Sequence, residues 1–156
     1  MAAELGQLAP GFTLPGSDNT DAGRREYSLE DYRGQVVVLV FYPGDSTPVC
    51  TRQLNAYTSD IDSFVAVDAQ VLAISPQSVD SHVKFAGGQD GFGFPLLADE
   101  EKAVGGAYGI LGPLGFYRRS VVVIDTAGKV TWVHRSIAGV TFKPSAQLVE
   151  AVRAAG

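Results

Sequence analysis

Cysteine, tryptophan and methionine each occur only once among the 156 residues of this chain. A single cysteine cannot form a disulfide within the chain, so packing alone must hold the fold together. A lone cysteine, taken by itself, usually behaves as a small buried apolar residue. Any chemistry assigned to Cys50 therefore has to be argued from the residues around it.

The chain also lacks an excess of positive charge and a long apolar run. Its 12 Lys and Arg are outnumbered by 17 Asp and Glu, and no basic block could follow a phosphate backbone, so we expect no nucleic-acid partner. The longest apolar run, Val36 to Phe41, is far shorter than the roughly 20 residues of a membrane-spanning helix. Residues 1–4 do not open like a signal peptide. We expect a cytoplasmic protein with no membrane partner.

The hydrophobic pattern predicts one α/β domain over residues 1–156, because 46% hydrophobic residues are enough to fill one core. The β-branched run 35–41 is typical of a strand covered on both faces, and Pro43 ends it. From Pro48 to Val67, apolar residues recur every three or four positions, which predicts one long amphipathic helix.

The rest of the chain continues the alternation of strands and helices. We expect a strand at 69–74, a helix at 78–86 capped by Ser78, a short helix at 100–108, strands at 120–124 and 130–135, and a helix at 144–154. Crossover connections imply parallel strands, and the tight turn at 126–129 implies an antiparallel pair. The pattern predicts a thioredoxin-like fold with a central mixed β-sheet flanked by helices.

Cys50 lies at the predicted start of the long helix, two residues after Pro48. Free backbone N–H groups and the helix dipole favour an anion there, and a thiolate is such an anion. A thiol at a helix start near a cation is reactive at neutral pH. The hydroxyl of Thr47 can cap the helix or point toward the sulfur or a bound oxygen, and Pro43 would shield one side of the sulfur from water. Each of these two residues alone is also an ordinary helix cap or strand terminator.

The spacing Pro43-x-x-x-Thr47-x-x-Cys50 resembles the signature of the peroxiredoxins, Pro-x-x-x-Thr-x-x-Cys. Residues 41–53 look like the bacterioferritin comigratory protein, or peroxiredoxin Q, branch of this AhpC/TSA-like family. The resemblance continues through most of the chain, in residues 6–14, 31–34, 74–85, 94–99, 107–109 and 119–130.

This resemblance implies a thiol-dependent peroxidase of hydrogen peroxide and alkyl hydroperoxides that acts in antioxidant defence. The thiolate of Cys50 would attack the peroxide and become a sulfenic acid, which further peroxide could over-oxidise. An arginine just before a late strand reaches the sulfur in the family, and Arg119 matches that place, with Arg118 as its rival. Thr47 and the N–H groups of Val49 and Cys50 would stabilise the developing charge.

The sequence departs from the family at Asn55, where many members of this branch carry a second, resolving cysteine. We therefore expect a one-cysteine enzyme whose sulfenic acid is reduced by an external thiol: thioredoxin, glutaredoxin or a low-molecular-weight thiol. We interpret Gln53 as anchoring the helix. The apolar, glycine-rich stretch 109–117 is either packed in the core or the face of a homodimer.

The remaining reactive residues predict no metal site and no organic cofactor. His82 and His134 have no second ligand at metal-binding spacing, and we expect Asp45, Asp60 and Asp62 to be solvated.

Two alternatives to the peroxidase remain open. One is a thioredoxin-fold binding or chaperone module with an inactive thiol. The other is a cysteine hydrolase, which would need a histidine base near the thiol.

Overall fold

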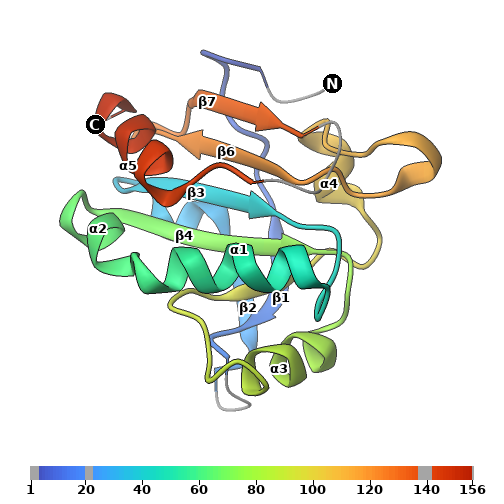
Figure 1. Ribbon diagram of the computed structural model, residues 1–156. Coiled ribbons are helices and arrows are strands. Elements are labelled where there is room, and N and C mark those ends of the chain that lie inside the picture. The colour runs from blue at the N-terminus through green and yellow to red at the C-terminus, as the bar shows by residue number, and fades with distance from the viewer. Residues whose placement is uncertain (1–3, 20–22, 137–141, 156) are drawn as a thin grey trace.

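The computed structural model describes residues 4–19, 23–136 and 142–155. Its strands form one seven-stranded sheet in the order β2-β1-β5-β4-β3-β6-β7 (Figure 1). The strands are β1 (Thr13–Ser17), β2 (Arg25–Ser28), β3 (Val36–Phe41), β4 (Ala69–Ser75), β5 (Leu96–Ala98), β6 (Ser120–Ile124) and β7 (Val130–Arg135). The three central strands β3, β4 and β5 are parallel, and the other pairings are antiparallel. The sheet is mixed, as predicted.

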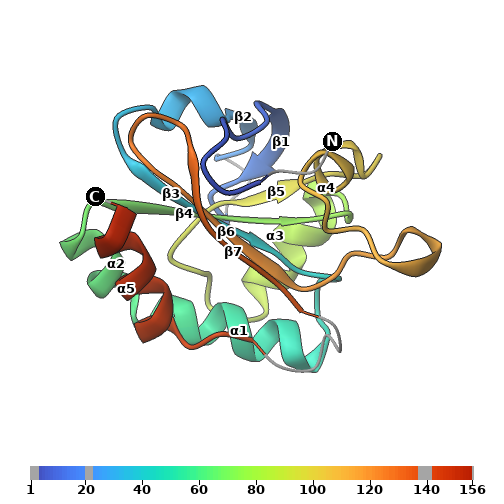
Figure 2. The same cartoon turned by 90° about the horizontal axis from the view of Figure 1, so that it is seen from above.

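Helices cover both faces of this sheet (Figure 2). They are α1 (Pro48–Ser59), α2 (Ile61–Ala66), α3 (Val79–Gly87), α4 (Ala103–Ala107) and α5 (Ser145–Ala155), with short 3-10 turns at Leu29–Tyr32 and Pro113–Gly115. All six residues of β3 are buried, because alternate side chains face two separate cores. Val38 and Val40 pack in the core that holds residues of α1, α2, α3 and α5. Leu39 and Phe41 pack in the core that holds residues of α4 and β1.

The long helix predicted over residues 48–67 is wrong, because the chain breaks it at Asp60 into α1 and α2. The Asp60 carboxylate accepts a hydrogen bond from the hydroxyl of Ser145, the first residue of α5. The apolar spacing continues across the break, so periodicity alone does not reveal it.

The other predicted elements are close to their positions in the structure. Ser78 caps α3 as expected, with its hydroxyl accepting a bond from the N–H of Ser81 at 3.1 Å. The helix predicted at 100–108 is shorter, because Lys102 takes a left-handed conformation with φ 61° directly before α4. Strands β2 and β5, with four and three residues, are too short to show a clear pattern in the sequence. Within the described ranges, every helix is too short or too polar to cross a membrane.

Candidate active site

Cys50 lies in the first turn of α1. Figure 1 shows this helix directly after the loop that leaves the C-terminal end of β3. Its side chain is 0% exposed and packs in the core between the sheet and the helices. Thr47 is the N-cap residue, with an extended backbone, and Pro48 occupies the first helical position. The first N–H groups of a helix have no acceptor within it, so the sulfur lies where an anion is stabilised.

Arg119, which is 69 positions away in the sequence, reaches this sulfur. It directly precedes β6, and the antiparallel register pairs Phe41, the last residue of β3, with Ser120. This pairing brings the Arg119 guanidinium to the start of α1, where Nη2 lies 3.2 Å from Cys50 Sγ. Arg119 is only 3% exposed, so solvent screens this contact weakly.

Arg118, its rival in the sequence, makes different contacts. Its Nε donates to the carbonyl oxygen of Ser136 at 3.0 Å, and its Nη2 donates to that of Arg135 at 3.3 Å. Consecutive residues of an extended chain point to opposite sides, so only one of two neighbouring arginines can face the thiol. The structure brings Arg119, and not Arg118, to Cys50.

Gln53 belongs to the same cluster, beyond the helix-anchoring role predicted for it. Its Oε1 accepts a hydrogen bond from Arg119 Nη1 at 2.5 Å, and its Nε2 donates to the Tyr57 hydroxyl at 3.3 Å. That hydroxyl donates to the backbone oxygen of Lys143 at 2.6 Å, and burial raises the pKa of Tyr57 to about 12. The spacing of three residues between Cys50 and Gln53, which places both on one helix face, is the sequence signal for this contact.

Thr47 and Pro43 lie in the loop before α1. The Thr47 hydroxyl donates to the carbonyl oxygen of Gly44 at 3.1 Å and makes no side-chain capping bond to α1. The hydroxyl therefore neither caps the helix nor donates to the sulfur, and it braces the loop instead. A bond to an oxygen of bound peroxide, the other role expected for it, stays a prediction. Pro43 is half-buried and follows the fully buried Tyr42. Its missing N–H ends the ladder of β3 at the point where the chain turns.

Asp45, in the same loop, is not solvated as predicted. Its side chain is 4% exposed, and it lies 2.7 Å from Nδ1 of His82, a residue of α3 that is itself fully buried. The sequence places Asp45 in a polar loop, and only the packing of α3 against this loop buries its side chain.

Asp60 and Asp62 are exposed, in agreement with the prediction. His134 is half-buried on β7, where desolvation and then the charge of Lys143 lower its pKa.

The residues that the structure describes contain no group of three or more His, Cys, Asp or Glu side chains arranged to hold a metal ion.

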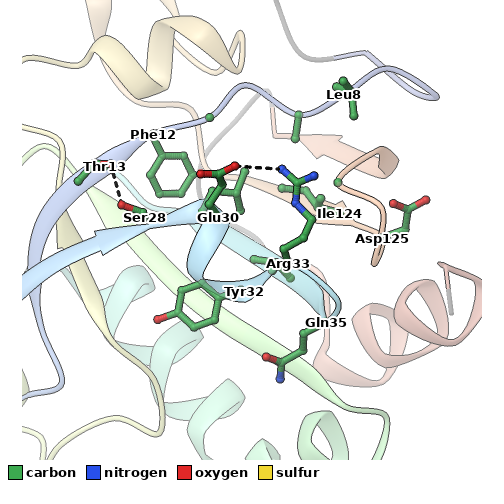
Figure 3. Close-up of a pocket in the computed structure, with 15 residues that line it drawn as sticks. Leu8, Phe12, Thr13, Ser28, Glu30, Tyr32, Arg33, Gln35, Ile124 and Asp125 are labelled. Carbon is green, nitrogen blue, oxygen red and sulfur yellow. Dashed lines mark hydrogen bonds and ion pairs between the residues drawn. The ribbon is translucent and has the colours of Figure 1, made fainter.

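A pocket of about 390 Å³ lies away from Cys50, between the N-terminal segment and the 3-10 turn at Leu29–Tyr32 (Figure 3). Gln35, which lines it, directly precedes β3, whereas Cys50 follows that strand. The pocket therefore lies at the opposite end of β3 from the thiol.

Residues 5–133 match the AhpC/TSA family. The chain belongs to this family. The thioredoxin peroxidase of Echinococcus granulosus is 36% identical over 135 residues, which cover 82% of this chain and 69% of that protein. A Helicobacter pylori protein named as the peroxiredoxin bcp is 37% identical over 132 residues, which cover 80% of this chain and 83% of that protein.

Solved structures show the same architecture as this AhpC/TSA chain. AhpC of Mycobacterium tuberculosis superposes with a TM-score of 0.88 at 23% identity, covering 99% of this chain and 93% of that one. The reduced 2-Cys peroxiredoxin of Plasmodium vivax gives 0.87 at 24% identity, covering 96% and 94%. The predicted family and the predicted thioredoxin-like α/β fold are thus confirmed. The roles of Pro43, Thr47, Cys50 and Arg119 stay predictions.

Proposed function

We propose that this chain is a thiol-dependent peroxidase, with Cys50 as the peroxidatic residue and hydrogen peroxide or an alkyl hydroperoxide as the substrate. The observation that carries the proposal is the contact of 3.2 Å between Arg119 Nη2 and Cys50 Sγ at a helix start. A buried guanidinium stays charged and offers several fixed donors, so it favours the thiolate and binds peroxide oxygens. Membership of the AhpC/TSA family supports this chemistry.

In the oxidative step, the Cys50 thiolate attacks the terminal oxygen of the peroxide. A sulfur–oxygen bond forms and the oxygen–oxygen bond breaks, so the sulfur is oxidised to a sulfenic acid and the peroxide is reduced to water or an alcohol. The leaving oxygen takes the peroxide proton, and the sulfenate that remains takes up from solvent the proton that the thiol had released, which gives the sulfenic acid. Arg119 and the N–H groups of the first turn stabilise the negative charge as it moves from sulfur to oxygen, and the Thr47 hydroxyl joins them when it exchanges its bond to Gly44 for one to the peroxide.

The reductive step needs a thiol from outside the chain, because Cys50 is its only cysteine. The position five residues later holds Asn55, whose side chain donates to Gln89 Oε1 at 3.0 Å. An external thiol condenses with the sulfenic acid to a mixed disulfide and releases water. A second thiol then restores Cys50 and leaves as a disulfide. Thioredoxin, glutaredoxin and a low-molecular-weight thiol are the candidate reductants.

Neither alternative is favoured by the geometry. An inactive module has no need for a buried arginine on its thiol, yet Arg119 keeps that contact. A hydrolase needs a free base, but both ring nitrogens of His82 lie at hydrogen-bond distance from oxygen atoms of Asp45 and Leu97.

We further propose that residues 1–156 form one domain and that the protein acts in the cytoplasm.

The protein also pairs as a homodimer, in our proposal, through the stretch 109–117. Part of this stretch is core, since Ile110 and Tyr117 are buried. Leu114 and Phe116, however, are 92% and 66% exposed, which supports a contact surface. Light scattering of the purified protein tests the homodimer.

A turnover assay tests the enzymatic proposal. The purified chain is given hydrogen peroxide or tert-butyl hydroperoxide together with a thioredoxin system, a glutaredoxin–glutathione system or dithiothreitol. We expect peroxide consumption with at least one of these reductants and none in Cys50→Ser. If no reductant supports consumption above the Cys50→Ser control, the peroxidase proposal fails.

A further inference from the structure

A buried polar cluster lies behind the active-site loop, centred on Asp45. The Asp45 carboxylate accepts hydrogen bonds from the hydroxyls of Tyr42 and Ser81, each at 2.7 Å, and lies 2.7 Å from His82 Nδ1. Its backbone N–H donates to Gln77 Oε1 at 2.9 Å. Two hydroxyl groups and one ring nitrogen thus surround the Asp45 carboxyl group, and an ionised carboxylate can accept from all three. These contacts join the Asp45 loop to α3.

His82 faces oxygen atoms at both ring nitrogens, and the Tyr42 hydroxyl also lies 3.4 Å from Nδ1. Its side chain is 0% exposed, with Nδ1 facing the Asp45 carboxylate and Nε2 lying 2.9 Å from the backbone oxygen of Leu97 in β5. A backbone carbonyl accepts hydrogen bonds and cannot donate them, so Nε2 carries a proton, and a second proton lies between Nδ1 and the Asp45 carboxyl group. With that proton on Nδ1, His82 is an imidazolium and forms with Asp45 a buried charge pair whose hydrogen bonds are charge-assisted.

We propose that Asp45 and His82 are positioning residues for peroxide reduction. Asp45 stands between Pro43 and Thr47, and its partners are Tyr42, directly after β3, and Ser81 and His82 of α3. Through His82 the cluster also reaches Leu97 of β5. The pair thereby fastens the loop that leads into α1 and determines where Thr47 and the first turn lie relative to Cys50. This inference rests on the proposed peroxidase function of Cys50. A buried pair suits such a role, because breaking it leaves an uncompensated charge inside the protein.

Kinetics of Asp45→Asn and His82→Gln test this inference. Each variant should slow oxidation of Cys50 by hydrogen peroxide about tenfold, because small displacements of positioned groups are costly in rate. Alkylation of Cys50 by iodoacetamide should become faster, because a loosened loop exposes the buried sulfur. The double variant Asp45→Asn/His82→Gln replaces the charge pair by two neutral amides and should recover part of the peroxide rate.

Asp99→Asn is the matched control. Asp99 is another buried carboxylate, 2% exposed, but it accepts bonds from the N–H groups of Val104 and Gly105 and from the Tyr117 hydroxyl. Its loss should lower the melting temperature and leave both rates at Cys50 unchanged. Opposite changes of oxidation and alkylation in the loop variants, absent from this control, separate positioning from general destabilisation.

Nitrogen NMR of the unmodified protein tests the charge pair without any variant of the pair. The chain has two histidines, and His134→Gln assigns their signals. We expect two N–H protons on the His82 ring at neutral pH. A ring with one N–H proton overturns the charge pair, and unchanged oxidation and alkylation rates in folded single variants overturn the positioning role. If the wild-type chain consumes no peroxide, the proposed function fails, while the alkylation rates and NMR still decide whether the pair holds the loop.

Discussion

Arg119 Nη2 lies 3.2 Å from Cys50 Sγ, although the two residues are separated by 69 positions in the chain. The contact depends on the pairing of β3 with β6. Cys50 lies in the helix that follows β3, and Arg119 directly precedes β6. Because the guanidinium is buried, its charge acts on the sulfur with little screening by solvent. This relationship is the geometric basis of the role that we propose for Cys50.

Arg119→Ala should slow oxidation of Cys50 by hydrogen peroxide about 100-fold, because it removes a fixed donor from the site of developing charge. Stopped-flow measurement under single-turnover conditions gives the rate constant. Arg118→Ala is the control, since Arg118 donates to the backbone oxygens of Arg135 and Ser136. A large loss in Arg118→Ala with none in Arg119→Ala would transfer the role to Arg118.

Gln53→Leu should slow the same step about tenfold, less than the loss of the arginine itself. The amide oxygen of Gln53 holds Arg119 Nη1 at 2.5 Å, so leucine leaves the guanidinium charged but poorly oriented. Gln70→Leu serves as the comparison, because its amide donates to the Val71 carbonyl on β4, at the opposite end of the sheet. Equal rates for Gln53→Leu and wild type would limit Gln53 to a structural role.

Thr47→Val should reduce the oxidation rate about tenfold, whereas Thr47→Ser should stay near wild type, because serine keeps the hydroxyl. The hydroxyl donates to Gly44 and braces the loop at the helix start. Thr51→Val is the control, since its hydroxyl donates one turn back to the Thr47 carbonyl, which also accepts the N–H of Thr51. A wild-type rate in Thr47→Val would show that the hydroxyl is dispensable.

Alkaline titration should reveal little tyrosinate in the native protein at pH 10, the ordinary pKa of tyrosine. Burial raises the pKa of all six tyrosines, and that of Tyr57 reaches about 12. The unfolded chain loses these protons first, so stability is fully present below pH 10 and falls as the pH rises toward 12. Ultraviolet absorbance, with and without denaturant, measures the difference. Equal tyrosinate in both samples at pH 10 would contradict the burial of these hydroxyls.

The sequence predicts those parts of the fold and site that depend on local pattern. The β-branched run 36–41, the cap at Ser78 and the helix start at Pro48 all follow from neighbouring residues, and all appear in the structure. The order of elements also leads to the mixed sheet, once crossover and hairpin connections are distinguished.

The parts that depend on tertiary contacts escape the sequence. The break at Asp60 accompanies a hydrogen bond from Ser145, 85 positions later, which no periodicity contains. The choice between Arg118 and Arg119 depends on the side to which each side chain points in the segment just before β6. From the sequence, Asp45 is predicted to be a solvated loop residue, because only the packing of α3 brings His82 to it.

The most direct test of the account is the stoichiometry of peroxide consumption by the freshly reduced protein without any reductant. Because the chain has one cysteine, we predict rapid loss of one mole of hydrogen peroxide per mole of chain. Dimedone should then label Cys50, and Cys50→Ser should consume none. No consumption by the wild-type protein, or equal consumption by Cys50→Ser, would contradict the assignment of Cys50 as the peroxidatic thiol.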